Sequence, residues 1–423
     1  MRDKTGRVLV AVAAATLLLG FVVACEKKSE GGGGAPAASG APIVVGSTLS
    51  LSGAFAATGA IHKIAGEAFV DRLNAEGGLL GRPVRWVVRD DESDQAKVSM
   101  LYEQLISQDK VDLIIGPYAT PNILSAMAVA ARHKYVLPQH TAVLAPLLTY
   151  ECQFPGWSIG STPNEFVPNQ LLDAVASLST PPKRIAIVTN QNGSTDFVSY
   201  GAGDNKVGAV SITRQRGLEL VLEKRYPPNF SDWASLATQV RDARPDLLIN
   251  NGLGVDPVNL LQAMAQLNYK PPMMFSLFPA PGPPLGLGPK ADGLMSVSIF
   301  EPNKATLDRL GAKATAVVND FKARATTAKL PYTVFETQAA ASWNAWEILV
   351  AGVKGAGKID HQAICDSLHS NGADTTFSGH LAFDASKHNF WPPTQTIKQI
   401  QDGDWVTVWP KDRAAGELRG PAA

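Results

Sequence analysis

The chain has 423 residues, of which 45% are hydrophobic and 18% are charged, a composition typical of a globular protein and not of a disordered one. Lys and Arg together number 38, as do Asp and Glu, so the charge balance gives no indication of a nucleic-acid partner. The length exceeds what one small core needs and is typical of two domains.

The first 25 residues have the pattern of a lipoprotein signal peptide. A basic head precedes the uncharged, mostly apolar run Val8–Ala24, and Cys25, whose thiol can carry a diacylglycerol, follows directly. A transmembrane anchor is the alternative, but 17 residues is at the short limit for crossing a bilayer. We therefore expect residues 1–24 to be removed and Cys25 to anchor the mature protein on the periplasmic or extracytoplasmic face of an inner or outer bacterial membrane. Residues 25–42, rich in Gly, Ala and Pro, are then a flexible tether.

From Ile43 onward, predicted strands and helices alternate with the spacing of βαβ units. The first set consists of strands Ile43–Thr48, Val84–Arg89, Val111–Ile115 and Tyr135–Pro138, helices Gly59–Asn74 and Gln95–Gln108, and a helix capped by Thr120 with Pro121 as its first residue. The second set consists of strands Arg184–Thr189, Gly217–Lys224, Asp246–Asn250 and Met273–Ser276, and helices Ser231–Asp242 and Pro257–Leu267. Strands regularly separated by helices predict an α/β fold with two parallel sheets, each covered by helices on both faces.

The remaining third, beyond about residue 300, is mainly helical and ends in short strands. Its predicted elements are helices Lys304–Arg324, Val334–Lys354 and His361–Ser370 and strands His380–Phe383, Thr396–Gln401 and Trp405–Trp409. We expect this segment to complete both domains and not to form a third one. The two tryptophans at 343 and 346 stand at helical spacing and are expected in the core.

Motifs for catalysis and metal binding are missing from the sequence. It has no G-x-S-x-G or H-E-x-x-H motif and no Cys/His cluster with metal-ligand spacing. We therefore expect no cofactor, no metal and no enzymatic activity. Cys152 and Cys365 are an even pair in an oxidising compartment, and the sequence leaves a disulfide and two buried thiols equally open.

Several short motifs occur in a fixed order along the chain. The N-terminal ones are Ser50-Leu51-Ser52-Gly53, the run NAEGGLLGR at 74–82, Asp90-Asp91 and Ile114-Ile115-Gly116-Pro117, and later ones are Tyr226-Pro227-Pro228, Arg244-Pro245-Asp246 and Gly403-Asp404-Trp405. This succession resembles the leucine/isoleucine/valine-binding family of periplasmic substrate-binding proteins for ABC transporters, over nearly the whole mature chain.

The resemblance implies a type I periplasmic binding protein fold, with two Rossmann-like lobes joined by three crossovers and the ligand in the cleft between them. Lobe 1 would be residues 43–158 completed by about 301–381, and lobe 2 residues 159–300 completed by about 385–410. The hinge segments on which the cleft closes are expected near Ile159–Pro163, Ser298–Glu301 and Leu381–Ala385.

Ligands of open α/β sheets bind beyond the carboxyl ends of the strands, where helix N-termini favour carboxylates. By resemblance, Thr120 helps to hold the ligand's α-carboxylate, Thr141 and Ala142 form a second ligand-contacting turn, and Thr58 lies near the ligand side chain. The alternative role of Thr120 is plain helix capping. The complete set of candidate ligand-binding residues is Ser52, Thr58, Tyr118, Ala119, Thr120, Thr141, Ala142, Ser194, Leu253, Asp256 and Leu277.

Lobe 2 departs from the pattern of similar amino-acid binders. The segment 190–194 stands where they place an aromatic residue, and Leu277 stands near a position that is usually acidic and pairs with the ligand ammonium. An apolar side chain cannot neutralise an ammonium, and an unpaired buried charge is costly. Either Asp256 or Asp196 replaces the missing acid, or the ligand is an aliphatic or aromatic carboxylate without an ammonium group.

The resemblance implies a monomeric solute-binding protein that delivers a small carboxylate-bearing ligand to the permease subunits of an ABC importer. A ligand-sensing receptor for a signalling partner has the same fold and is the first alternative. An enzyme acting on a cleft-bound substrate is the second, but no residue stands out as catalytic. His140, beside the second turn, either recognises an acid or is a hydrogen-bonded structural histidine, and the structural role is favoured.

Overall fold

The computed structural model describes residues 38–421. The predicted signal peptide, Cys25 and most of the tether lie outside these residues. Within them, no helix combines the length and the apolar composition needed to cross a membrane.

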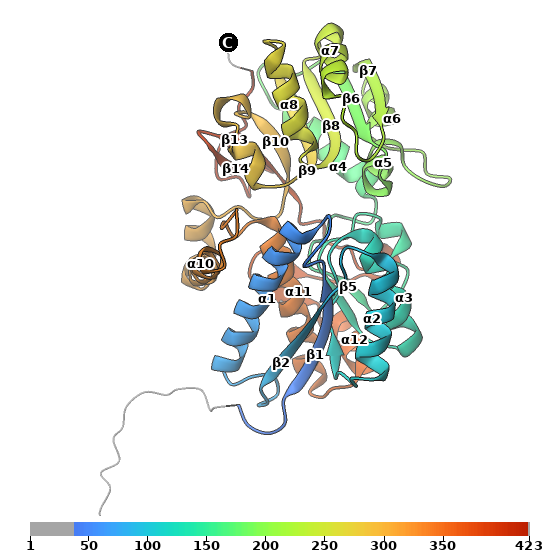
Figure 1. Cartoon of the computed structure of the whole chain (residues 1–423), viewed down its shortest axis with the longest axis vertical. Coiled ribbons are helices and arrows are strands. Elements are labelled where there is room, and N and C mark those ends of the chain that lie inside the picture. The colour runs from blue at the N-terminus through green and yellow to red at the C-terminus, as the bar shows by residue number, and fades with distance from the viewer. Residues whose placement is uncertain (1–37, 422–423) are drawn as a thin grey trace, which may run out of the picture. The chain divides into compact units, whose positions relative to one another are not determined.

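Lobe 1 contains a three-stranded parallel sheet with the order β2-β1-β3, in which Val45 of the central strand lies opposite Trp86 and Leu113 (Figure 1). A second parallel pair, β4-β5, is not hydrogen-bonded to this sheet. The elements of this part are β1 (Ile43–Leu49), α1 (Ala56–Ala75), β2 (Val84–Asp90), α2 (Gln95–Ser107), β3 (Leu113–Ile114), α3 (Thr120–His133), β4 (Leu137–Gln139), the 3₁₀ turn Ala145–Leu147 and β5 (Gln153–Pro155).

Lobe 2 contains a seven-stranded sheet with the order β14-β13-β10-β9-β8-β6-β7. Strands β6 to β10 are parallel to one another, whereas β13 pairs antiparallel with both β10 and β14 at one edge. Its elements are α4 (Pro163–Ala176), β6 (Arg184–Asn190), α5 (Gly193–Tyr200), α6 (Ala209–Gln215), β7 (Glu219–Tyr226), α7 (Trp233–Ala243), β8 (Leu247–Gly254), α8 (Asp256–Gln266), β9 (Met273–Pro279), α9 (Gly282–Leu285), the 3₁₀ turn Gly288–Lys290, β10 (Leu294–Ser298), β13 (Thr396–Gln401) and β14 (Asp404–Trp409). The C-terminal strands are therefore part of this sheet.

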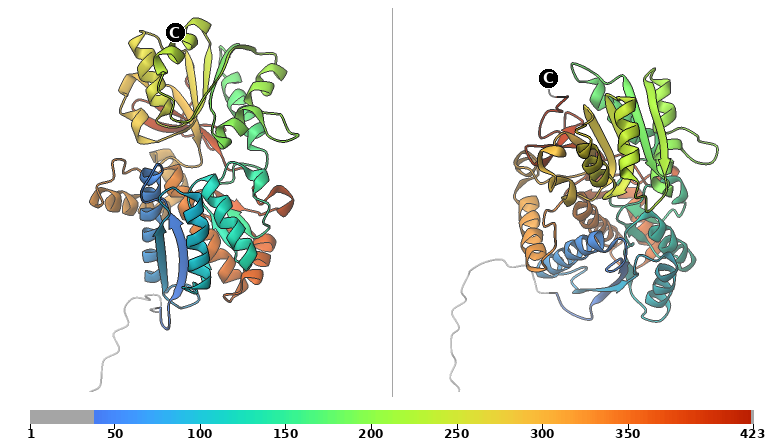
Figure 2. Two further views of the ribbon diagram at one scale, coloured as in Figure 1. Left: turned by 45° about the vertical axis from the view of Figure 1, so that its right-hand side comes forward. Right: turned by 45° about the horizontal axis from the view of Figure 1, so that its top comes forward.

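The late helices pack on lobe 1, where α10 and α11 both contact α1 (Figure 2). These elements are α10 (Lys304–Thr327), α11 (Thr337–Ala356), α12 (His361–Asn371), the hairpin β11 (Ala373–Thr375) and β12 (Gly379–Leu381), and the 3₁₀ turn Ala385–Lys387. Gly66 allows α1 to approach β2 and α11 closely, because a Cβ there would lie 2.4 Å from Cζ3 of Trp86 in β2 and 3.0 Å from Nε1 of Trp346 in α11. Trp343 and Trp346 are 2% and 1% exposed, which confirms that they belong to the core.

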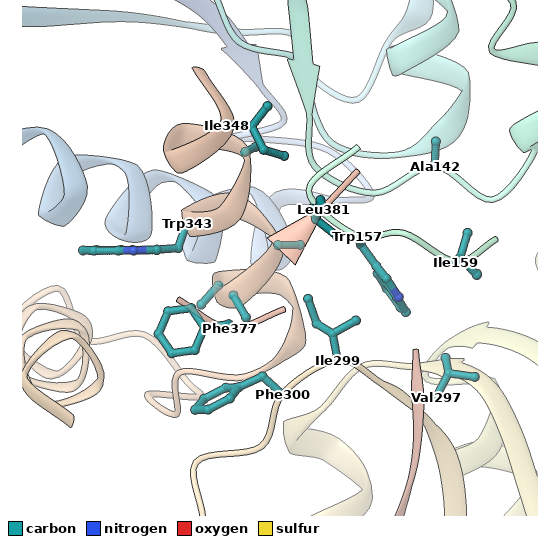
Figure 3. Packing of buried hydrophobic residues seen from close by; sticks show 14 of the residues in the cluster. Ala142, Trp157, Ile159, Val297, Ile299, Phe300, Trp343, Ile348, Phe377 and Leu381 are labelled. Atoms are coloured by element: carbon teal, nitrogen blue, oxygen red, sulfur yellow. The ribbon is translucent and has the colours of Figure 1, made fainter. Parts of the chain in front are cut away.

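One continuous hydrophobic cluster includes residues from each of the three segments predicted to be hinges. Ile159, Ile299 and Leu381 are all buried in it, together with Trp157 and Phe300 (Figure 3). The chain therefore passes through a single packed core at these three places.

A disulfide joins Cys152, just before β5, to Cys365 of α12, with 5.3 Å between their Cα atoms. The two residues are separated by 213 positions in the sequence. The bond therefore attaches the late helices covalently to the strands of lobe 1.

The α/β fold is confirmed, and most predicted elements lie within two or three residues of the observed ones. The sequence analysis missed α4 because the helix contains Pro168, and an internal proline normally argues against a helix. It also missed the short helices α5, α6 and α9 and the strands β5, β10 and β11. The prediction that Thr120 caps a helix is wrong, because α3 already includes Thr120 and its cap position is Ala119.

Candidate ligand-binding site

The loop after β1 is fixed by two carboxylates that follow β2. Buried Asp91 accepts hydrogen bonds from the hydroxyls of Thr48 (2.8 Å) and Ser50 (2.6 Å). Asp90 accepts one from the Ser52 hydroxyl at 2.8 Å. Ser52 is exposed and its hydroxyl already donates to Asp90, so its side chain stabilises the loop in this structure.

The N-terminus of α3 is held in a specific geometry. Ala119 has φ 73° and ψ 140°, a backbone conformation that residues other than glycine rarely adopt. Such strained residues are often found at functional sites. Thr120 is 4% exposed, and its hydroxyl accepts a hydrogen bond from the backbone N–H of Val143 at 2.8 Å. That bond connects the first turn of α3 to the turn after β4. Because a hydroxyl both donates and accepts, Thr120 can still donate its hydrogen to a ligand oxygen.

The turn after β4 presents two different side chains. Thr141 is 7% exposed, and its hydroxyl has no hydrogen-bond partner among residues 38–421. Ala142 is buried in the hydrophobic cluster (Figure 3). Thr141 therefore offers a free hydroxyl to a ligand, whereas Ala142 can contact one only through its backbone.

Four rings form a continuous row beside these turns. The Tyr118 ring is edge-on to Phe55, with 5.7 Å between centroids, and lies 5.1 Å from the ring of His62. His62 in turn stacks on His140, with 4.3 Å between centroids and 20° between planes. Burial raises the pKa of Tyr118 to about 12, and a hydrogen bond with Thr58 opposes this rise. Thr58, Tyr118, Thr120 and Thr141 thus belong to one cluster in lobe 1.

Both histidines of the row are neutral. Burial, and then repulsion from His140, holds the pKa of His62 well below its usual value, and burial lowers the pKa of His140 to about 3. None of their four ring nitrogens makes a hydrogen bond of good geometry within the described part of the chain. Hydrogen-bonding contacts with the Gln338 side chain and with the Pro117 backbone still oppose the lowering of the pKa of His62 and of His140, respectively. The expectation that His140 is a hydrogen-bonded structural histidine therefore stays a prediction. The sequence analysis did not select His62, although a histidine among the apolar positions of a predicted helix was a signal.

In lobe 2, Asp256 is already occupied by contacts within the lobe. Its Oδ2 accepts hydrogen bonds from the Asn190 side chain (2.8 Å), the Tyr226 hydroxyl (3.0 Å) and the Leu253 backbone (3.2 Å). It lies in the first turn of α8, whose cap position is Val255, so it is not the helix cap. Asp256 therefore stabilises the ends of β6, β7 and β8 against each other.

The other lobe 2 candidates have separate environments. Asp196 forms an ion pair with Arg225. Leu277 is 0% exposed and its side chain belongs to the hydrophobic cluster. Ser194 is half-buried, in the first turn of α5, where its backbone N–H donates to Asn192. The structure thus leaves neither Asp196 nor Asp256 as an acid without a partner.

Two hollows elsewhere on the molecule do not include any of the candidate residues. A cavity of about 450 Å³ lies between the end of α12 and the segment that contains Phe383 and Trp391. A second one, of about 220 Å³, lies between α1 and α11 and is lined by Arg72, Lys313 and Glu347. The candidate site is therefore identified from its polar side chains and not from either of these cavities.

Comparisons with known proteins identify the family and the fold of this chain. A sequence model of the family described as periplasmic binding protein matches residues 42–404. The Leu/Ile/Val-binding protein homolog 7 of Brucella suis biovar 1 is 24% identical over 402 residues, covering 92% of this chain and 96% of the relative. Homolog 8 of Brucella abortus (strain 2308) is 26% identical over 236 residues, covering 55% of this chain, and the match spans only 57% of that relative's length.

Solved structures share the fold. The branched-chain amino acid transporter substrate binding protein LivJ from Streptococcus pneumoniae, in complex with isoleucine, has a TM-score of 0.67 at 19% identity and covers 86% of this chain and 98% of its own. A solute binding protein of an ABC transporter from R. palustris, in complex with benzoate, has a TM-score of 0.67 at 19% identity. The match covers 90% of this chain and 98% of that protein's chain. Because the family model spans most of the chain, from the first strand of lobe 1 to the last strand of lobe 2, this protein belongs to the periplasmic binding protein family.

Proposed function

We propose that this chain is a lipid-anchored extracytoplasmic solute-binding protein that captures a small carboxylate-bearing ligand by cleft closure and delivers it to an ABC importer. The observation that carries this proposal is the N-terminus of α3, where Thr120 bonds to Val143, two residues after Thr141, whose own hydroxyl has no partner among the described residues. The first N–H groups of a helix have no partner within the helix. A helix N-terminus and two hydroxyl donors together suit a carboxylate. The anchor rests on the sequence pattern that ends at Cys25.

The ligand we favour is an aliphatic or aromatic acid without an ammonium group. An ammonium needs an acidic partner, but Asp256 already accepts three hydrogen bonds and Asp196 pairs with Arg225. Leu277, which stands where an acid is usual, is buried in the core. Among the structural relatives, one was solved with isoleucine and another with benzoate, so the fold accommodates both classes. A hydrophobic amino acid is the second candidate.

A thermal-shift panel tests the proposal. The purified mature protein, with Cys25→Ala to prevent lipidation, is mixed with leucine, phenylalanine, 4-methylpentanoate, 3-phenylpropanoate and benzoate. A compound at 100 times its dissociation constant adds about 2.7 kcal/mol of stability, which gives a clear shift. We expect the deaminated acids to stabilise the protein more than the matching amino acids. Stabilisation by the amino acids alone would mean that another acid neutralises the ammonium.

One further outcome of the panel and two separate experiments test the alternatives. If no carboxylate stabilises the well-folded protein, carboxylate capture is contradicted. A ligand-sensing receptor would bind the same compounds. Binding of this protein to permease subunits in detergent would indicate a transport component, and lack of such binding would favour the receptor. Recovery of chemically unchanged ligand after prolonged incubation argues against an enzyme.

A further inference from the structure

The two histidines of the ring row are not explained by carboxylate capture. His62 and His140 are 0% and 1% exposed, yet no ring nitrogen makes a hydrogen bond of good geometry within residues 38–421. The contacts with Gln338 and with the Pro117 backbone involve one partner for each ring, which leaves a second nitrogen on each ring without one. Buried polar atoms are nearly always paired, and an unpaired one destabilises the folded state. A purely structural position would favour an apolar side chain. These nitrogens are therefore the polar groups of lobe 1 that most need an external partner.

The pair lies within the candidate site. His140 is the residue immediately after β4 and the neighbour of Thr141. His62 is one helical turn after Thr58 on α1, so both point to the same face of that helix. The Tyr118 ring, which directly precedes the α3 turn, lies 5.1 Å from that of His62. A ligand with its carboxylate at α3 therefore has the imidazoles as neighbours of its remaining atoms.

The chemistry of the pair is that of two neutral imidazoles. Each neutral ring offers one N–H donor and one nitrogen acceptor. Rings stacked with 4.3 Å between centroids can each direct one nitrogen toward the same atom. A hydroxyl group donates one hydrogen bond and accepts another, so it can satisfy one nitrogen of each ring. The Gln338 side chain makes a hydrogen-bonding contact with His62, which opposes the lowering of the pKa of that histidine.

A charged ligand group fits the pair less well. The buried acid Glu336, whose charge helps to raise the pKa of Tyr118, caps α11 by accepting the N–H of Gln338 at 3.0 Å. Neutral imidazoles supply no counter-charge, and a buried charge without one is costly. A metal ion is also a poor fit, since no group of three or more His, Cys, Asp or Glu at metal-binding spacing exists in the part of the chain that the structure describes.

We propose that His62 and His140 form a ligand subsite that hydrogen-bonds an uncharged hydroxyl group, so that the preferred ligand is a hydroxylated carboxylic acid. This inference rests on the proposed function, because the carboxylate end of the same ligand occupies the α3 turn. The subsite then selects among acids by their second polar group. An acid that lacks the hydroxyl leaves the buried nitrogens unpaired and is disfavoured.

Calorimetric titration of matched compounds tests the subsite. The first set is benzoate, 3-hydroxybenzoate and 4-hydroxybenzoate, and the second is 4-methylpentanoate, 2-hydroxy-4-methylpentanoate and leucine. The proposal does not fix the position of the hydroxyl on the ligand. In each set, the hydroxylated compound with the lowest dissociation constant is therefore compared with the unsubstituted parent acid. We expect that member to bind at least about tenfold more tightly than its unsubstituted parent, the effect of one or two net hydrogen bonds.

The variants His62→Leu and His140→Leu separate a ligand role from a structural one. Both should reduce the hydroxyl preference to about onefold, by weakening binding of the hydroxylated acid more than binding of its parent. The ligand-free melting temperature should stay the same or rise, because an unpaired buried polar group has been replaced by an apolar one. A marked fall in melting temperature would show that the nitrogens are paired in the folded protein and would overturn the inference.

His361→Leu is the matched control. His361 is a histidine of α12 that is only partly buried, and its Nδ1 accepts the N–H of Val136 at 3.3 Å. Its substitution should lower the melting temperature without changing the hydroxyl preference.

The two proposals fail in different ways. If the wild-type protein binds parent and hydroxylated acids equally, or binds leucine best, the hydroxyl subsite is wrong and carboxylate capture stands. If no compound of either set binds, carboxylate capture is wrong and the subsite falls with it.

Discussion

Thr120 connects stability and ligand binding at one residue. Its hydroxyl accepts the Val143 N–H at 2.8 Å, and its hydrogen is available to a ligand. Thr120→Val keeps the shape and removes both functions. We expect the free energy of unfolding to fall by about 1–2 kcal/mol and the affinity for the carboxylate to fall about tenfold, as measured by urea denaturation and calorimetric titration. Thr120→Ser retains the hydroxyl and should behave like the wild type. A variant that is destabilised but binds normally would remove Thr120 from the site.

The neutral histidine pair gives stability a defined pH dependence. The pKa of His140 is lowered from 6.5 to about 3 by burial, and that of His62 also lies well below 6.5. In the unfolded chain both return to about 6.5, so below that pH the unfolded state binds protons that the folded state does not. The free energy of unfolding therefore falls as the pH decreases from about 6.5 toward 3, and this loss is absent above 6.5.

The double variant His62→Leu/His140→Leu isolates this effect. Between about pH 7 and pH 4.5 it should lose less stability than the wild type, by about 2 kcal/mol or more, as followed by chemical denaturation at each pH. Burial raises the pKa of Glu336 to about 7, which gives stability the opposite pH dependence. That contribution is common to both proteins and cancels in the difference. Parallel pH profiles for the two proteins would contradict the assignment of neutral histidines.

Some of the site could be predicted residue by residue, and some could not. The sequence indicates the turn at α3 because a buried strand, a short loop and Pro121 follow one another locally. It does not indicate that the Thr120 hydroxyl bonds to Val143, because that contact depends on tertiary packing. His62 was missed for a similar reason. Helical periodicity identifies the buried face of α1 through its apolar residues but does not show that a polar one there meets His140.

At the scale of elements, the disulfide attaches α12 to the strand pair of lobe 1. The Cys152–Cys365 bond spans 213 positions, so it restricts the unfolded chain strongly. We expect Cys152→Ala/Cys365→Ala to lower the free energy of unfolding by about 2–5 kcal/mol. Urea denaturation with and without a reductant measures this. The reductant should destabilise the wild type and leave the variant unchanged, and equal stability of the two oxidised proteins would contradict a structural disulfide.

Predicting the elements succeeded where the pattern was local. Strand β13 was predicted with the bounds that it has in the structure. Strands β1, β2 and β6 each end one residue later than predicted. The sheet order was not deducible from local pattern, because β13 reaches β10 from about a hundred residues away. Helix α4 was missed because Pro168 argues against a helix, yet its ring is tolerated there in a packed position.

At the scale of the whole molecule, a buried ionic network joins elements of both lobes where the chain crosses between them. Glu301, just after β10, accepts hydrogen bonds from Lys398 of β13 (2.6 Å) and from Ser298 (3.0 Å). The Ser298 hydroxyl in turn bonds to that of Thr337, the first residue of α11, at 2.8 Å. The side chains of Lys398 and Glu301 are 4% and 1% exposed, so neither charge is screened by water.

Removing one member of this pair tests how strongly the crossovers depend on it. Lys398→Met leaves the Glu301 carboxylate buried without its cation, and we expect a loss of about 3–5 kcal/mol of unfolding free energy. The double variant Glu301→Leu/Lys398→Met removes both charges and should recover most of that loss, because an apolar replacement avoids desolvating either group. A double-mutant cycle from urea denaturation measures the coupling. Additive effects of the two substitutions would mean that the pair contributes no coupling at the crossovers. Strong coupling would mean that the two charges stabilise the crossovers as one unit, because each is then costly to bury without the other.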